Sequence, residues 1–174
     1  MVEVHNGSGA PGPLWYRVGQ VQANKTIAWS NSKQFDYGWN PSVAMSGGNV
    51  VEAHNSSAAA GPLFYSVGQV QSTGTISWGA SYQYDVGWNP KVALFADFNN
   101  ILEVHNGGPG AGPMWYHWGN YSGPSTINFG PSIEYDSGEN PSVAIGSRHP
   151  VEVHNGGSGP GAEWYHVGDI ELIQ

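Results

Sequence analysis

The segment Val2-Glu3-Val4-His5-Asn6 decides the fold, because the chain contains four copies of it. The histidines of successive copies are 49, 51 and 49 residues apart. Self-similarity at a fixed period of this length predicts a repeat architecture. The other three copies are Val51-Glu52-Ala53-His54-Asn55, Leu102-Glu103-Val104-His105-Asn106 and Val151-Glu152-Val153-His154-Asn155.

Three further signatures follow the histidine motif in a constant order. An aromatic segment begins nine residues after each histidine, at 14–16, 63–65, 114–116 and 163–165. An Ile-x-aromatic segment follows at 27–29, 76–78 and 127–129. Last comes an aromatic-Asp-x-Gly-x-Asn-Pro segment that leads into Val-Ala at 43–44, 92–93 and 143–144.

The spacing also locates an insertion. From each histidine to the asparagine of Asn-Pro there are 35 residues, and from that asparagine to the next histidine there are 14, 16 and 14. The two extra residues therefore lie within 96–100. Insertions are tolerated at loop tips, so this segment is expected to be a hairpin turn.

Each repeat is expected to form four short strands. Val-Glu-Val-His alternates with period two, and the aromatic and β-branched segments are typical of strands. Four strands in roughly 50 residues is typical of one propeller blade. We expect an all-β fold, a β-propeller of four-stranded blades with about 3.5 repeats per chain. The expected divisions of this single domain are 1–40 (partial), 41–89, 90–140 and 141–174 (partial).

The repeat count bears on assembly. Four histidine motifs and three Asn-Pro motifs argue against a β-trefoil. The pattern predicts 14 strands, with an incomplete blade at each end, and open sheet edges promote association. A homo-oligomer is therefore expected, a dimer of 28 strands foremost, as in a seven-bladed ring. An eight-bladed ring and a four-bladed monomer are the alternatives.

Composition excludes several classes. Only 10% of the 174 residues are charged, the formal net charge is −8, and the five Lys and Arg are scattered. Nucleic-acid binding needs clustered cations, so it is not expected. No apolar stretch is long enough to predict membrane insertion. The chain lacks cysteine and its first residues do not resemble a signal peptide. Extracellular action and cytoplasmic storage both remain open.

The combined pattern Val-Glu-Val-His, Leu-Trp-Tyr-Arg-Val-Gly, Ile-x-Trp and Tyr-Asp-x-Gly-x-Asn-Pro-Ser-Val-Ala resembles propeller-type repeats of bacterial and fungal secreted proteins. Some of those repeats are appended to phospholipase-like domains. Repeat length, aromatic content and Gly-rich loops are also similar to β-propeller lectins of bacteria, fungi and invertebrates. This resemblance implies a lectin-like propeller, but no lectin motif matches residue by residue.

The Glu-x-His pair is the main candidate site. Positions i and i+2 of a strand share a face, so the two side chains can face one ligand. One interpretation is a sugar site; the other is a pair that satisfies itself between blades. Two ligands per repeat are fewer than zinc sites use, so no metal is expected, and no cofactor either. In Asp-x-Gly-x-Asn-Pro, turn formation is favoured over ligand binding at Asp36, Asp85 and Asp136. Trp39 and Trp88 are possible stacking platforms.

Catalysis is not expected, because the chain has no Gly-x-Ser-x-Gly and its acids recur in every repeat. The sequence predicts a non-enzymatic, multivalent carbohydrate-binding protein whose partners are glycans or glycoconjugates. The alternative is a non-catalytic structural or protein-interaction module. The expected carbohydrate-binding residues are Glu3, His5, Asn6, Trp39, Glu52, His54, Asn55, Trp88, Glu103, His105, Asn106, Glu152, His154 and Asn155.

Overall fold

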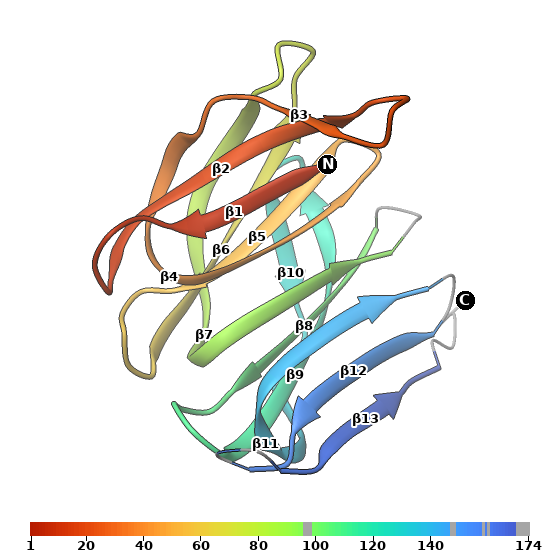
Figure 1. Ribbon diagram of the computed structural model, residues 1–174. Coiled ribbons are helices and arrows are strands. Elements are labelled where there is room, and N and C mark those ends of the chain that lie inside the picture. Colours follow the sequence, from red (N-terminus) through yellow and green to blue (C-terminus); the bar gives the residue numbers. More distant parts are fainter. Residues whose placement is uncertain (96–98, 147–148, 158, 160, 170–174) are drawn as a thin grey trace.

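A computed structural model describes residues 1–95, 99–146, 149–157, 159 and 161–169. The described residues form strands and connecting loops, without helices (Figure 1). The strands are β1 (Val2–Asn6), β2 (Gly12–Val21), β3 (Ile27–Trp29), β4 (Lys33–Ser46), β5 (Asn49–Asn55), β6 (Gly61–Val70), β7 (Ile76–Leu94), β8 (Asn100–Asn106), β9 (Gly112–Gly123), β10 (Thr126–Phe129), β11 (Ile133–Ile145), β12 (Pro150–Asn155) and β13 (Glu163–Val167).

All these strands belong to one antiparallel sheet with the order β1-β2-β4-β5-β6-β7-β8-β9-β11-β12-β13. The short strands β3 and β10 pair with β2 and β9 beside this path. The end strands β1 and β13 do not pair with each other, so the described sheet is open. In Figure 1 it descends from the red amino-terminal strands to the blue carboxy-terminal ones.

Three long strands, β4, β7 and β11, each pair with different neighbours along their two halves. The first half of β4 pairs with β2, and its second half, from Trp39 onward, pairs with β5. In the same way β7 passes from β6 to β8, and β11 passes from β9 to β12. These shared strands divide the sheet into four units. Unit 1 holds β1–β3, unit 2 holds β5 and β6, unit 3 holds β8–β10, and unit 4 holds β12 and β13.

Each shared strand changes direction at an Asn-Pro pair. Asn40, Asn89 and Asn140 have positive φ angles of 49°, 53° and 56°. Asparagine tolerates this left-handed conformation better than most residues. The following proline has no N–H to place in a ladder, and the pairing register shifts at this point in all three strands. The result is a bulge that turns the strand from one unit into the next.

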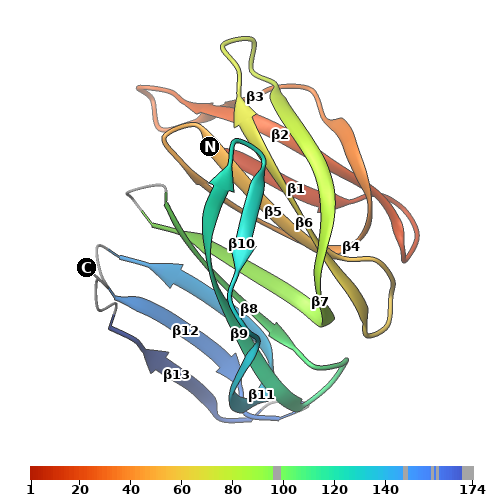
Figure 2. The same cartoon turned by 180° about the vertical axis from the view of Figure 1, so that it is seen from behind.

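The units stack face to face, and the apolar core lies between them (Figure 2). Ile76 and Trp78 of β7 pack onto Tyr16 of unit 1. Ile127 of β10 packs in the same way onto unit 2, beside Tyr65. The Ile-x-aromatic segment of one unit thus covers the apolar face of the unit before it.

The all-β expectation is confirmed. The expected turn at Asp36, Asp85 and Asp136 is wrong, because all three residues lie within strands. Each carboxylate does accept the next residue's N–H, as in a turn, but the adjoining backbone continues the ladder. The expected count of 14 strands is also wrong for the described residues, which form 13, because the Ile-x-aromatic segment at 76–78 and the Val-Ala segment at 92–93 are joined in β7.

The predicted hairpin turn at 96–100 lies largely outside the described residues. The strands on either side pair as a hairpin, and Phe95 N donates to Asn100 O at 3.0 Å. Within the described part of the chain, no helix has the length and apolar character needed to cross a membrane.

Candidate functional site

Three of the four Glu-x-His pairs lie where successive units meet. In unit 3, Glu103 is opposite His117 and His105 is opposite Trp115 across the β8–β9 ladder. Opposite residues point to the same side of a sheet, so both histidines and Glu103 share one face. That face is turned toward unit 2, since Asp85 of β7 lies 2.6 Å from His117. We call each such contact between units a junction.

Each glutamate of a Glu-x-His pair is hydrogen-bonded to the histidine two residues later. The Glu carboxylate lies 3.0 Å from Nδ1 in the pairs Glu52–His54, Glu103–His105 and Glu152–His154. In these three pairs no residue is more than 5% exposed. Glu3 and His5 are less buried but bind each other, and Glu3 also accepts from Arg17 at 3.1 Å. The pairs Glu52–His54 and Glu103–His105 are therefore closed to a sugar in this structure, whereas Glu152 borders a pocket described below.

Burial and the neighbouring carboxylates act in opposite directions on the pKa of His54 and His105, and burial opposes the effect of His54 on the pKa of Glu52. Burial raises the pKa of the Glu52 carboxyl, against the lowering effect of His54. Burial alone would lower the pKa of His105, but the Glu103 and Asp85 carboxylates outweigh it and raise that pKa. The pKa of His54 is raised in the same way, by Glu52 and Asp36.

The asparagines after the histidines hold the bends of the shared strands. Asn55 is fully buried; its Nδ2 donates to Gly87 O at 3.1 Å, and its Oδ1 accepts from Asn89 N at 2.8 Å. Asn106 makes the same two bonds, to Gly138 and Asn140. Asn6 makes one, to Gly38 O at 3.2 Å, and Asn155 is half-buried. The polar groups of Asn55 and Asn106 are thus occupied by backbone.

The glycines beside these asparagines leave no room for a side chain. A Cβ on Gly38 would lie 2.5 Å from both His54 Cδ2 and Asn55 O. A Cβ on Gly87 would collide with His105, and a Cβ on Gly138 with His154, in the same way. The glycine of Asp-x-Gly-x-Asn-Pro therefore allows the shared strand to lie against the histidine of the next unit.

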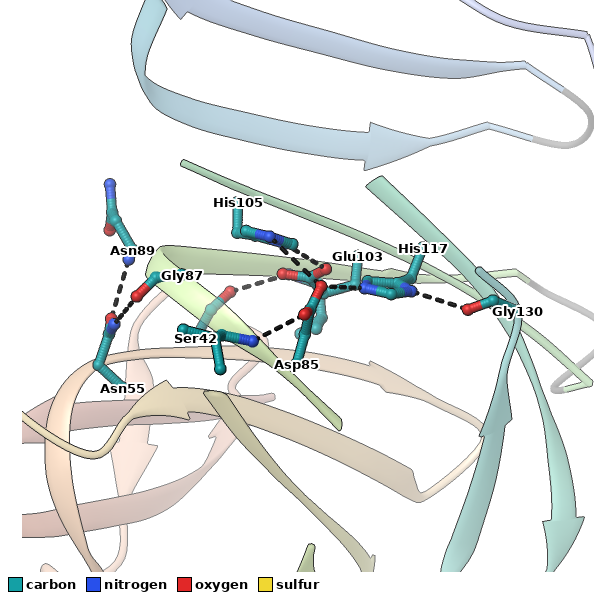
Figure 3. A network of polar contacts seen from close by, with 11 residues as sticks. Ser42, Asn55, Asp85, Gly87, Asn89, Glu103, His105, His117 and Gly130 are labelled. Atoms are coloured by element: carbon teal, nitrogen blue, oxygen red, sulfur yellow. Dashed lines mark hydrogen bonds and ion pairs between the residues drawn. The ribbon is translucent and has the colours of Figure 1, made fainter. Parts of the chain in front are cut away.

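The junction between units 2 and 3 brings two histidines to one aspartate (Figure 3). Asp85 Oδ2 lies 2.6 Å from His117 Nε2 and 3.6 Å from His105 Nε2. His117 Nδ1 lies 2.9 Å from Gly130 O, and His105 Nδ1 contacts Glu103. Burial acts to raise the pKa of Asp85, but hydrogen bonds from His117 and from Val86 N outweigh it and lower that pKa.

The junction between units 3 and 4 repeats this arrangement in a more open setting. Asp136 Oδ2 lies 2.6 Å from His166 Nε2 and 3.5 Å from His154 Nε2. The hydrogen bond from His166 lowers the pKa of Asp136. At the junction between units 1 and 2, which we call the first junction, Ser66 occupies the position of the second histidine. There Asp36 Oδ2 lies 3.9 Å from His54 Nε2.

A pocket of about 750 Å³ lies beside the last of these clusters. Leu102, Val104 and Tyr116 of unit 3 line one side, and Glu152 and His166 of unit 4 line the other. At the two earlier junctions the corresponding space holds an Ile-x-aromatic segment. Within the described residues, unit 4 supplies no such segment.

Sequence reasoning missed Asp85, Asp136, His117 and His166 as partners of the Glu-x-His pairs. It counted ligands within one repeat, whereas each cluster takes its aspartate from one repeat and its histidines from the next. The available signal was the residue after the repeated tyrosine, which is Arg17, Ser66, His117 and His166 in turn. Trp39 and Trp88 lie at equivalent bends and are half-buried; Glu139 occupies their position in β11.

Comparison with protein-family models gave no match. No significant similarity was found to curated proteins or to solved structures.

Proposed function

We propose that this chain is a non-catalytic interaction module that binds a second copy of itself, the exposed face of unit 4 against the exposed face of unit 1. One observation carries the proposal. The same junction is made twice inside the chain, and each of its two halves is also present, uncovered, at one end of the stack.

The internal junction has a constant geometry. Tyr16 OH donates to Ile76 O at 3.4 Å and accepts from Ile76 N at 3.1 Å. Tyr65 OH makes the same pair of bonds to Ile127, at 3.1 and 3.0 Å. The aromatic residue two positions on then packs edge-on against the tyrosine. Trp78 does so at 5.8 Å from Tyr16, and Phe129 at 5.5 Å from Tyr65.

Both halves of this junction are exposed at the ends. On unit 4, Tyr165 is at the position of Tyr16 and Tyr65, and it is 71% exposed. Val151 and Val153 flank it and are also exposed. On unit 1, Ile27 and Trp29 are at the positions of Ile76 and Trp78, and Trp29 is 38% exposed. The apolar face of unit 4 therefore fits the Ile-x-Trp segment of another copy.

Such a contact joins two different surfaces, so it is heterologous. Repetition of one rotation either closes into a ring, as in a β-propeller, or continues as an open filament. We propose the closed form, a propeller-like dimer of two chains, because a ring leaves neither end face exposed.

The test is the mass in solution, measured by light scattering after gel filtration over a range of concentrations. The wild-type chain is expected to have twice the monomer mass. Trp29→Asp blocks the unit 1 face and Tyr165→Asp blocks the unit 4 face. In a dimer of either variant alone, both contacts contain one substituted face, so each variant alone is expected to lose the closed form. When the two variants are mixed, the intact unit 4 face of Trp29→Asp can still bind the intact unit 1 face of Tyr165→Asp. The mixture is therefore expected to form a one-to-one dimer.

Val86→Asp is the matched control, because Val86 is 58% exposed and lies away from both end faces. It is expected to keep the wild-type mass. Circular dichroism checks that every variant keeps its strands. A wild-type chain that stays monomeric at all concentrations contradicts the proposal, as does a dimer that persists in the Trp29→Asp, Tyr165→Asp double variant.

Carbohydrate binding is the second candidate, and it now rests on Trp39 and Trp88. Both rings are half-buried rather than buried, and both lie at the same point of a shared strand. Aromatic rings stack on the apolar faces of sugars. A glycan array tests this function: Trp39→Ala with Trp88→Ala is expected to abolish any signal, whereas Trp29→Ala is expected to keep it. Absence of signal from the wild-type chain removes this candidate.

A further inference from the structure

We propose that the clusters Asp85–His105–His117 and Asp136–His154–His166 each bind a divalent transition-metal ion, zinc foremost. In each cluster one carboxylate oxygen and two imidazole nitrogens lie within 4.8 Å of one another. Two histidines and one carboxylate are a ligand set that binds zinc and leaves a fourth position for water. The inference is independent of the proposed self-association.

The hydrogen bonds of the first cluster direct both Nε2 atoms toward the aspartate. Gly130 O can only accept, so Nδ1 of His117 carries the hydrogen. The Glu103 carboxylate fixes the hydrogen on Nδ1 of His105 in the same way. Each ring can therefore present an Nε2 lone pair to the ion once its Nε2 proton is lost. A carboxylate or carbonyl on the far nitrogen is the usual partner of a metal-bound histidine.

The distances between the ligand atoms suit a zinc ion with little movement of the side chains. Ligand atoms that lie about 2.1 Å from a tetrahedral zinc are about 3.4 Å from each other. The two Nε2–Oδ2 distances are 2.6 and 3.6 Å around Asp85, and 2.6 and 3.5 Å around Asp136. At the short contact the ion replaces the proton shared by histidine and aspartate, which is released to solvent.

The second cluster adds an independent observation. His154 is 2% exposed, and its Nε2 has no hydrogen-bond partner among the described residues. A buried nitrogen without a partner is costly, and this one points to the atoms of Asp136 and His166. His166 also lines the 750 Å³ pocket, so water or an anionic ligand can reach the ion there.

Charge favours the ion as well. Once the Nε2 protons are released, the carboxylates of Asp85 and Glu103 are the anions around the first cluster, with Lys91 as a cation near Glu103, and Asp136 and Glu152 are the anions around the second. A divalent cation is attracted to these carboxylates. Because the aspartate belongs to one unit and the histidines to the next, the ion links two units across their junction.

The first junction provides a natural comparison. Its Asp36 and His54 match the other clusters, but Ser66 stands where the second histidine would be. Only one imidazole is available there. The wild-type chain is therefore expected to bind two zinc ions, not three.

The experiment counts bound zinc. The chain is stripped with EDTA, transferred to chelator-free buffer and titrated with Zn²⁺ by calorimetry, and bound metal is measured by mass spectrometry after gel filtration. The wild-type chain is expected to bind two equivalents, and His117→Ser and His166→Ser one each. The double variant is expected to bind none. Serine is chosen because the first junction already accommodates it.

Four further measurements make the outcome decisive. His149→Ala removes an exposed histidine outside both clusters and is expected to leave two equivalents. Mg²⁺ is expected not to bind, since imidazole ligands select transition metals. Zn²⁺ is expected to raise the melting temperature of the wild-type chain but not of the double variant. Ser66→His is expected to add a third equivalent when it folds.

Two results overturn the proposal. One is a wild-type chain that binds no zinc at micromolar concentration. The other is a folded double variant that binds as much zinc as the wild-type chain, because the metal would then lie elsewhere.

Discussion

The buried asparagines Asn55 and Asn106 each join two segments of backbone that are far apart in the sequence. Asn55→Ala leaves Gly87 O and Asn89 N without partners in a buried place. The expected loss is about 2–3 kcal/mol of unfolding free energy. Asn6→Ala is the matched variant, because the half-buried Asn6 makes only one such bond, and we expect a loss of about 1 kcal/mol or less. Urea denaturation measures both, and equal losses would contradict this account.

Lys91 carries a charge that the fold places in a poorly solvated position. Burial lowers its pKa from 10.5 to about 8, although Glu103 acts to raise it. Between pH 8 and 10.5 the unfolded chain binds more protons at this residue than the folded chain. Its contribution to stability therefore rises with pH across that window, by at most about 3 kcal/mol.

Lys91→Met removes this effect, so the variant is expected to be more stable than the wild-type chain at pH 7. That advantage is expected to shrink by pH 9.5. Urea midpoints at the two pH values measure it, with Lys33→Met, at an exposed lysine, as the control. An advantage of Lys91→Met that is the same at both pH values would contradict the assigned pKa.

Among the elements, the bend of β4 depends on the positive φ of Asn40. Alanine is strained in this conformation by about 1–2 kcal/mol, whereas glycine is not. We expect Asn40→Ala to be less stable than Asn40→Gly by about 1 kcal/mol. Thermal denaturation of the pair measures the difference. If the alanine variant were the more stable of the two, the bend would not require a left-handed residue.

Most of the elements could be predicted from the sequence, because alternation and aromatic content mark β1, β2, β5 and β6 directly. The segments that lead into Asn-Pro in β4, β7 and β11 could not. Their Asp, Gly, Asn and Pro residues favour turns locally, and only the neighbouring unit shows why a strand forms there. Gly87, for example, is required by the backbone of Asn106. That contact joins two repeats and leaves no periodic signal within either one.

The candidate site shows the same limit. The Glu-x-His pair could be identified from its recurrence, and its self-satisfied form was one of the two interpretations. The partners at Asp85 and His117 are 32 residues apart, and only stacking of two units brings them to 2.6 Å. A repeat analysed alone therefore shows half of each cluster.

On the scale of the whole molecule, burial is greatest in the middle of the stack and falls toward unit 4. Six of the seven residues of β5 and of β8 are buried, whereas all five of β13 are exposed. We expect hydrogen exchange of zinc-free monomer to be at least about tenfold faster in β13 than in β5. Mass spectrometry of peptic peptides measures this, with β8 as the slow reference. Equal exchange in β13 and β5 would contradict the gradient.

The shared strands also constrain how such a chain can change in evolution. Because each shared strand spans two successive repeats, a recombination event that adds or removes one whole repeat keeps every kind of strand pairing. An insertion or deletion of any other length within a shared strand shifts its register. The aspartate of that strand then no longer lies opposite the histidines of the next unit. The length of the chain is therefore inherited in steps of one repeat, and smaller changes are confined to hairpin tips such as that between β7 and β8.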